Sequence, residues 1–228
     1  LLERALESIF RQSRRPDEVL VIDDGSTDDT PDRIPERFPD VRFIRQEQRG
    51  VSAARNRGIR AARGKWLAFL DSDDAWLPEK LGRQLEALRT EPEHSLCHTN
   101  EIWIRRGRRV NPMKKHEKFG GRIFQACLPL CIISRSSAVL HRELFDEFGL
   151  FDETFPVCED YDFWLRVCAR RPVLYLDEPL IVKYGGHDDQ LSRSQWGMDR
   201  FRIRALEKVV SSETLSAEDR QAGVRTLL

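Results

Sequence analysis

Residues 65–78 read KWLAFLDSDDAWLP, a short apolar run that ends in three carboxylates. An apolar run of this length, followed by turn-forming residues, is typical of a buried strand in a parallel sheet. A second run of the same kind lies upstream, where EVLVIDD at residues 18–24 is followed by Gly25 and Ser26. The two runs predict a sheet whose strands end in acidic loops.

Helical periodicity separates these strands. Leu2, Leu6 and Ile9 share one face of a helix at the start of the chain. Capping residues and apolar spacing predict further helices over residues 26–38 and 50–63 and from Pro78 onward, with another strand at 41–45. The alternation of strand and helix predicts an α/β fold, a mostly parallel sheet flanked by helices.

The pattern changes after Ser95. We expect strands at residues 96–104, 173–176 and 180–184, helices at 141–148, 161–171 and 190–211, and a hairpin turn at 105–109. A basic stretch without periodicity continues to Arg122. Because no repeat or linker interrupts the chain, the sequence predicts a single domain over residues 1–228, with a smaller mixed subregion after residue 94.

Composition excludes several classes of protein. The 228 residues include 38 Lys and Arg and 38 Asp and Glu, so the net charge is zero and a dedicated nucleic-acid binder is disfavoured. With 40% hydrophobic residues the chain can bury a core, which excludes general disorder. No apolar run approaches the roughly 18 residues of a transmembrane helix. The five cysteines are odd in number and lack zinc-site spacing, which favours free thiols in a reducing compartment.

The acidic loops are candidate ligand sites. In open α/β sheets, ligands bind beyond the carboxyl ends of the strands. Turn and cap chemistry accounts for Ser26 and Asp28. It accounts poorly for Asp71, Asp73 and Asp74, because three carboxylates so close together repel one another. A divalent cation, Mg²⁺ or Mn²⁺, would relieve that repulsion.

Three segments, VLVIDDGSTDDT, GVSAARNRGIRAARGKWLAFLDSDDAWLP and FDETFPVCEDYDFWLR, occur in this order. Together they resemble the family 2 glycosyltransferases of the GT-A fold, and the resemblance extends from about Leu1 to about Ser194. It implies a transferase that moves a sugar from a nucleotide-diphosphate donor to an acceptor hydroxyl, with inversion and with Mn²⁺ or Mg²⁺. Residues 1–94 would then bind the nucleotide sugar, and residues 95–228 would form the acceptor side.

The resemblance also implies roles for individual residues. Asp24 would contact the nucleotide base and Asp71 the ribose, while Asp73, the last residue of the DXD motif, would bind the metal. Asp160 would be the general base, with Glu159 beside it in the substrate site. Asn56 would line the nucleotide pocket, and His187 would meet the diphosphate or the metal.

Each role has a structural alternative. Asp160 and Glu159 suit the start of a helix, where carboxylates complement the dipole. His187 follows a Gly-Gly pair and suits a turn, and Asn56 suits a polar helix position. Trp76 follows the acid cluster, where it would either contact the acceptor or anchor the core.

One departure from the family pattern concerns the start of the chain. Family members open with a strand reading roughly V-S-V-I-I-P-x-Y-N before the helix that begins here at Leu1. Without it, we expect an unfilled slot between two neighbouring strands, and we hypothesise that the 228 residues are part of a longer chain.

Two other functions stay open. One is a nucleotidyltransferase-like enzyme, which shares nucleotide and metal chemistry, and the other is a degenerate, non-catalytic module that binds nucleotide sugars. A dinucleotide dehydrogenase is excluded, because G-x-G-x-x-G is absent.

The resemblance implies an acceptor that is a carbohydrate, a lipid-linked saccharide or another hydroxyl compound. We expect a cytoplasmic protein whose contact with the inner face of the membrane is at most peripheral. The basic run at residues 105–118 suits a solvated loop, and its alternative role is to bind acidic lipid head groups.

Overall fold

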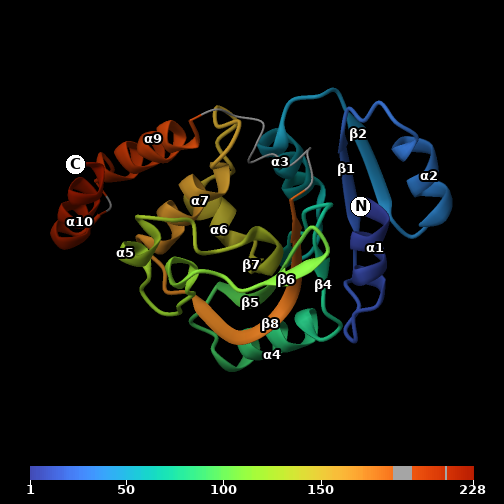
Figure 1. Ribbon diagram of the computed structural model, residues 1–228, viewed down its shortest axis with the longest axis horizontal. Coiled ribbons are helices and arrows are strands. Elements are labelled where there is room, and N and C mark those ends of the chain that lie inside the picture. The colour runs from blue at the N-terminus through green and yellow to red at the C-terminus, as the bar shows by residue number, and fades with distance from the viewer. Residues whose placement is uncertain (187–196, 214) are drawn as a thin grey trace.

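The computed structural model describes residues 1–186, 197–213 and 215–228 (Figure 1). In the first half, the elements are α1 (Leu2–Phe10), β1 (Leu20–Asp24), α2 (Thr30–Arg37), β2 (Arg42–Gln46), α3 (Val51–Ala61), β3 (Trp66–Ala68), β4 (Ala75–Trp76), α4 (Lys80–Thr90) and β5 (Leu96–Arg105). In the second half, they are β6 (Arg108–Val110), η1 (Lys114–His116), α5 (Phe124–Cys127), η2 (Arg135–Ser137), β7 (Val139–His141), α6 (Glu143–Phe148), α7 (Glu159–Cys168), β8 (Leu174–Gly185), α9 (Met198–Val210) and α10 (Ala217–Leu227).

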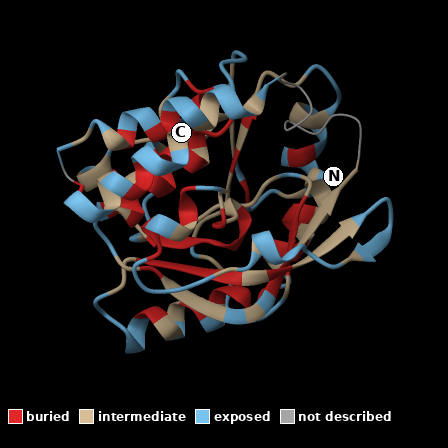
Figure 2. Cartoon of the chain, turned by 60° about the vertical axis from the view of Figure 1, so that its left-hand side comes forward, coloured by how far each residue is buried: buried red, intermediate tan, exposed pale blue. Residues whose placement is uncertain are grey.

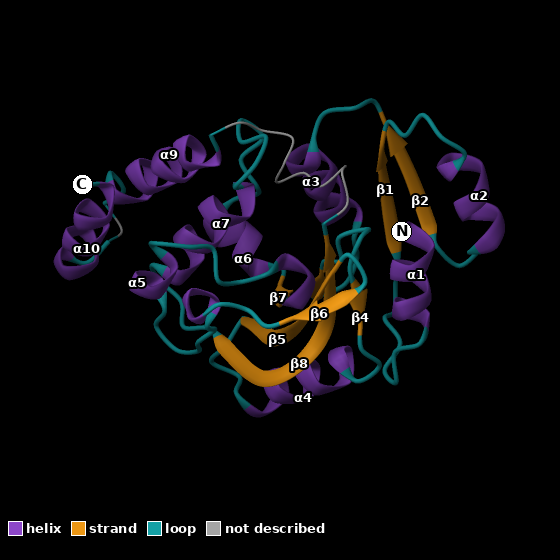
Figure 3. Cartoon of the chain, in the orientation of Figure 1, coloured by secondary structure: helices purple, strands orange, loops and turns teal. Residues whose placement is uncertain are grey.

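The strands of the described residues form two sheets. β1 and β2 make a parallel pair, and the larger sheet has the order β3-β7-β5-β8-β4, with β6 paired to β5 (Figure 3). In the larger sheet β5 and β8 are parallel, whereas β7 is antiparallel to both β3 and β5, and β4 is antiparallel to β8. The α/β class is confirmed. The expected sheet flanked by helices is confirmed as well; its strands β3, β5 and β8 run in one direction, and the short strand β7 runs against them between β3 and β5.

The larger sheet separates two apolar clusters. Side chains alternate across a strand, so neighbouring residues face opposite sides. Leu96 and Leu140 therefore pack with α5, α6 and α7, while Cys97 and Val139 pack with α1 and α4. Figure 2 shows the buried residues concentrated in the sheet and on the inner faces of the helices.

The helix α1 is fixed to the larger sheet, not only to β1. The hydroxyl of Ser8 accepts a hydrogen bond from the backbone N–H of Trp76 at 3.0 Å. The side chain of Gln12 donates to the carbonyl of Leu77 at 2.7 Å. These bonds hold α1 against β4, so the first helix closes one side of the space between the two sheets.

A cleft of about 1670 Å³ lies between β1 and β3, which belong to different sheets. Its apolar walls include Leu6, Ile9, Val21, Leu67 and Val139, and its polar end contains Asp24 and Asp71. The slot expected between two neighbouring strands is therefore present. The edges of β1 and β3 that face it have no strand partner among the described residues.

Several expected elements differ in the structure. The two strands expected at 173–176 and 180–184 are one strand, β8, with irregular pairing to β5 near Asn100. The helix expected at 190–211 is described only as α9, since residues 187–196 lie outside the described part. Helix α10 was not expected, although Ser216 caps it by accepting from the N–H of Asp219.

All five cysteines are free, as the sequence predicts. None of the helices in the described part combines the length and the apolar character needed to cross a bilayer.

Lys80, the first residue of α4, is an unusual core residue. Its side chain is fully buried, its Nζ lies 4.3 Å from the centre of the Trp76 ring, and it has no hydrogen-bond partner among the described residues. Burial lowers the pKa of Lys80 to about 7. Since an unbonded buried polar group is costly, this residue lowers the stability of the fold.

We therefore predict that Lys80→Met raises the free energy of unfolding by about 1–3 kcal/mol at pH 7. Between pH 7 and 10 the unfolded chain keeps its proton on Lys80 and the folded chain releases it, so the wild type gains stability as pH rises. The advantage of the variant should shrink accordingly in chemical denaturation. Lys65→Met, at an exposed position, is the control. A destabilised Lys80→Met protein would contradict this account.

Candidate active site

Three carboxylates gather in the loop that joins β3 to β4. Asp71, Asp73 and Asp74 each place an oxygen within 4.8 Å of the others. Asp74 is buried. Its carboxylate accepts one hydrogen bond from the hydroxyl of Ser136 at 2.7 Å and another from the backbone N–H of Tyr184 at 3.3 Å. Burial raises the pKa of Asp74 to about 7. The structure thus confirms that these acids crowd together, as their spacing predicts.

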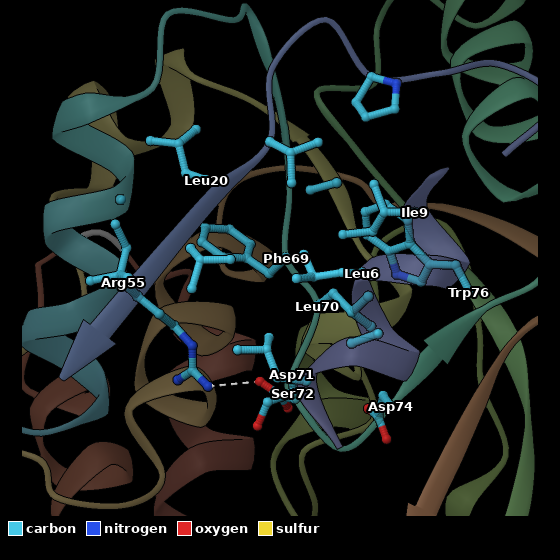
Figure 4. Close-up of a pocket in the computed structure, with 18 of the residues that line it drawn as sticks. Leu6, Ile9, Leu20, Arg55, Phe69, Leu70, Asp71, Ser72, Asp74 and Trp76 are labelled. Atoms are coloured by element: carbon cyan, nitrogen blue, oxygen red, sulfur yellow. Dashed lines mark hydrogen bonds and ion pairs between the residues drawn. The ribbon is translucent and has the colours of Figure 1, made fainter. Parts of the chain in front are cut away.

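Two arginines neutralise Asp71. Arg55 of α3 lies 3.0 Å from its Oδ1, and Arg135 of η2 lies 2.9 Å from its Oδ2. Burial alone would raise the pKa of Asp71, but the Arg135 and Arg55 guanidiniums outweigh it and hold the pKa well below its usual range. Asp71 is therefore a fixed negative charge between two cations. Figure 4 shows Arg55 reaching Asp71 at the polar end of the cleft.

The same arginines bind the start of α7. Arg135 lies 2.6 Å from Asp160 and 3.3 Å from Glu159, and Arg55 also pairs with Glu159. Asp160 and Glu159 stand in the first turn, where the partial positive charge of the helix favours carboxylates. Cys158 precedes them with φ of 65°, a left-handed conformation that turns the chain into the helix.

Together these five residues form what we call the charge network: Arg55, Arg135, Asp71, Glu159 and Asp160. It joins α3, the loop after β3, η2 and α7, which are far apart in sequence. The network brings the loop of Asp71–Asp74 and the Glu159–Asp160 pair to one place. The sequence predicts both acidic groups, whereas the structure supplies the two cations that connect them.

Asp24 ends β1 at the same cleft. Its oxygens accept from the side chain of Gln46 at 2.6 Å and from the N–H groups of Arg49 and Gly50 at 2.9 and 2.7 Å. Gly50 has φ of 90°, a conformation that favours glycine. Asp24 therefore fixes the turn that leads into α3, and with it the helix that carries Arg55.

Asn56 is not brought to the cleft. Asn56 is 1% exposed. Its side-chain amide donates hydrogen bonds to the carbonyl of Phe151 and to the carboxylate of Glu153, and it accepts one from the backbone N–H of Phe151. It holds the loop before α7 against α3. Contact with a nucleotide stays a prediction that this placement does not support.

Trp76 and Glu159 are also more buried than a substrate contact requires. Trp76 is 6% exposed, and its indole N–H donates to the carbonyl of Ser136 at 2.9 Å, so it anchors the core beside the cleft. Glu159 is 1% exposed and pairs with both network arginines. His187 lies outside the described residues.

Lys183 of β8 is a further residue that the sequence analysis did not predict. It lines the cleft. Burial opposes its charge, but the carboxylates of Glu101 and Asp74 outweigh burial and raise the pKa of Lys183. No local sequence signal marks Arg55, Arg135 or Lys183, because their partners come from distant segments.

The acid cluster has the donor set of a magnesium or manganese site. Its ligand atoms are carboxylate oxygens, which hard divalent cations prefer. Asp71 and Asp74 already accept protein hydrogen bonds, so their orientation is fixed. The residues present therefore fit a divalent cation, with Asp73 as the expected main ligand.

The glycosyl transferase family 2 model matches residues 1–149. The chain belongs to this family. An uncharacterized glycosyltransferase of Rickettsia felis is 32% identical over 178 residues, which are 77% of this chain and 29% of the relative. The succinoglycan biosynthesis protein ExoO of Rhizobium meliloti is 34% identical over 174 residues, 69% of this chain and 49% of the relative.

A third relative, UDP-Glc:alpha-D-GlcNAc-diphosphoundecaprenol beta-1,3-glucosyltransferase WfaP of Escherichia coli, is 30% identical over 173 residues, 72% of this chain and 64% of the relative. This chain spans less than two thirds of the length of each of these three relatives. Among solved structures, S. aureus TarS 1-349 in complex with UDP-GlcNAc has a TM-score of 0.77 at 20% identity, and the match covers 99% of this chain and 67% of that TarS 1-349 chain. That likeness shows a shared GT-A fold.

The charge network should be essential for stability as well as for the site. Arg135→Gln leaves Asp160 without its cation and Asp71 with Arg55 alone, and breaking a mostly buried ion pair in this way costs up to about 3–5 kcal/mol. Arg33→Gln, which removes an exposed arginine paired with Glu3 and Asp29, should cost less than about 1 kcal/mol. Urea unfolding of both variants measures the difference. If both variants lose the same free energy of unfolding, the ion pairs of Arg135 stabilise the fold no more than an exposed pair does.

Proposed function

We propose that this chain transfers a sugar from a nucleotide-diphosphate sugar to an acceptor hydroxyl, with inversion at the anomeric carbon. The observation that carries this proposal is the meeting of two acidic groups, Asp71–Asp74 and Glu159–Asp160, through the charge network. One group suits the charged donor and the other suits the acceptor. Membership of glycosyl transferase family 2 supports the same chemistry.

The donor would bind along the polar end of the cleft. Asp24 ends β1 on one side of the cleft, and Asp71 follows β3 on the other side. These positions suit a nucleoside, because its base and ribose offer N–H and hydroxyl donors to the two carboxylates. The E. coli relative is named for a UDP-glucose donor, and TarS was solved with UDP-GlcNAc. These names favour a uridine nucleotide for this chain.

The leaving group gains negative charge as the glycosidic bond breaks. A divalent cation held by Asp73, beside Asp71 and Asp74, would offset the charge on the departing diphosphate. The chain's own cations add to this effect: Lys183 lines the cleft, and Arg55 and Arg135 lie beside Asp71. Fixed charges of this kind stabilise a transition state without reorganising during the reaction.

The acceptor hydroxyl must lose a proton as it attacks. Asp160 is the proposed general base, and its ion pair with Arg135 fixes the orientation of the carboxylate. An inverting displacement requires the base on the face opposite the leaving group. Asp160 comes from α7 and the acid cluster from the loop after β3, so the two functions reside on different segments.

The acceptor class follows from the relatives. One is named for a diphosphoundecaprenol-linked acceptor and another for succinoglycan biosynthesis. We propose a saccharide acceptor, carried on a lipid at the cytoplasmic face of the membrane. His187 would complete the donor site, and Asn56 would act through the loop that it holds.

We predict that Asp160→Asn lowers the rate of sugar transfer by about 10²–10⁴-fold, because the amide cannot accept the proton. Affinity for the nucleotide should be unchanged, since Asp160 does not contact it in this proposal. Release of nucleoside diphosphate, followed with and without saccharide acceptors, measures the rate. The control is Asp146→Asn, at an exposed position of α6.

An unchanged rate in Asp160→Asn would remove Asp160 from the mechanism. If the wild type binds the nucleotide sugar but does not transfer the sugar to any acceptor, the chain is a binding module. Release of pyrophosphate from a nucleoside triphosphate and a sugar phosphate would favour the nucleotidyltransferase instead.

A further inference from the structure

Residues 105–119, which we call the basic segment, concentrate positive charge in a chain that is neutral overall. The segment covers the end of β5, the turn to β6, and η1. Its charged residues are Arg105, Arg106, Arg108, Arg109, Lys114, Lys115 and Lys118, against a single acidic residue, Glu117. So strong a local excess creates an electrostatic attraction for anions.

Most of this charge is not neutralised by the rest of the described protein. Lys118 is the exception, because it is buried and pairs with Glu101 at 3.4 Å. The other six cations are exposed, and no ion pair joins any of them to a described residue. By contrast, the exposed Arg33 and Arg37 of α2 both pair with Glu3. The basic segment thus keeps its charge available to a partner.

Two apolar side chains are exposed among these cations. Met113 is 60% exposed and Phe119 is 41% exposed. The other large apolar residues exposed in the described part are the chain ends Leu1 and Leu228 and the helical residues Ile203 and Val224. An ordinary solvated loop has no need of exposed Met and Phe. Cations combined with exposed apolar side chains are typical of a surface that binds the membrane interface.

The basic segment adjoins the candidate active site. The N–H of Arg106, at the hairpin turn, donates to the carbonyl of Gly185 at 3.2 Å. The neighbouring residue of β8, Tyr184, donates its N–H to Asp74 of the acid cluster. In Figure 1 the hairpin of β5 and β6 lies beside β8 and β4. A surface bound at the hairpin would therefore be close to the reacting groups.

We propose that the basic segment docks the protein onto an anionic lipid surface. Arginine and lysine side chains bind the phosphates of the lipid head groups, while Met113 and Phe119 enter the interface between head groups and acyl chains. This inference extends the proposed function by presenting a lipid-linked acceptor to the site. Its test does not depend on that function, because vesicle binding is measured without donor or acceptor.

The first experiment measures binding of the whole chain to phosphatidylcholine vesicles with and without phosphatidylglycerol. Each Lys or Arg close to an anionic surface contributes about a five-fold increase in binding. We expect Arg108→Gln, Arg109→Gln, Lys114→Gln and Lys115→Gln together to weaken binding to the anionic vesicles by at least about 100-fold. Binding should also weaken as salt increases.

The matched control removes the same number of exposed charges elsewhere, at Arg57, Arg60, Arg63 and Lys65. This control should keep most of the vesicle binding, and both quadruple variants should keep the melting temperature of the wild type. Equal losses in the two variants would overturn the proposal, because attraction would then depend on total charge. Failure of the wild type to bind anionic vesicles would overturn it directly.

A second pair of changes separates a membrane from a soluble anionic polymer. Met113→Ser with Phe119→Ser should remove the part of the vesicle binding that persists at high salt, while leaving the low-salt attraction. If this variant binds vesicles as the wild type does, and inorganic polyphosphate displaces the wild type from them, the segment binds anionic polymers and the membrane proposal is wrong.

Discussion

The ion pairs of Arg55 and Arg135 are the interaction on which the site depends. Three carboxylates from two distant segments would repel one another if they were brought together without a counter-charge. The two guanidiniums, each in contact with Asp71 and Glu159, make that convergence possible. Because buried ions are costly unless they are paired, the network ties the formation of the site to the folding of α3, η2 and α7.

Hydrogen bonds outside this network hold in place the segments that carry it. Asp24 fixes the turn before α3, and Asn56 fastens the loop before α7 to the same helix. Asp74 receives hydrogen bonds from Ser136 and Tyr184, which link η2 and β8 to the acid cluster. A side chain can thus be essential to the site without touching a substrate. Rigid supports of this kind keep reacting groups in position.

The sequence predicts much of the first half of the fold, because apolar runs of residues 18–24 and 65–70 and the helical periodicity between them are local signals. It does not predict β7, a strand of three residues whose place between β3 and β5 is set by tertiary packing. The sequence pattern predicts a break near residues 177–179, but β8 continues through these residues and its pairing with β5 is irregular there. Local sequence patterns do not show this irregularity, because it depends on pairing with a strand that is distant in sequence.

The acidic residues of the site could be predicted from the sequence with the help of the family resemblance, but their environment could not. Arg135 has no motif around it, and its partners become visible only in three dimensions. Trp76 and Asn56 stand next to recognisable motifs, yet the structure buries both in supporting roles. A residue that is close to a motif in sequence therefore does not have to contact the substrate. The direction in which its side chain points is the stronger indication.

The proposed function depends first on a donor site for a nucleotide sugar, formed by the cleft and the acid cluster. Calorimetric titration with UDP, GDP and dTDP, each with Mn²⁺ and with EDTA, tests it most directly. We expect one of these nucleotides, with UDP favoured, to bind in the presence of Mn²⁺, and Asp73→Asn to lose this binding while the variant stays folded. Absence of binding by all three nucleotides, or binding that ignores both Mn²⁺ and Asp73→Asn, would contradict it.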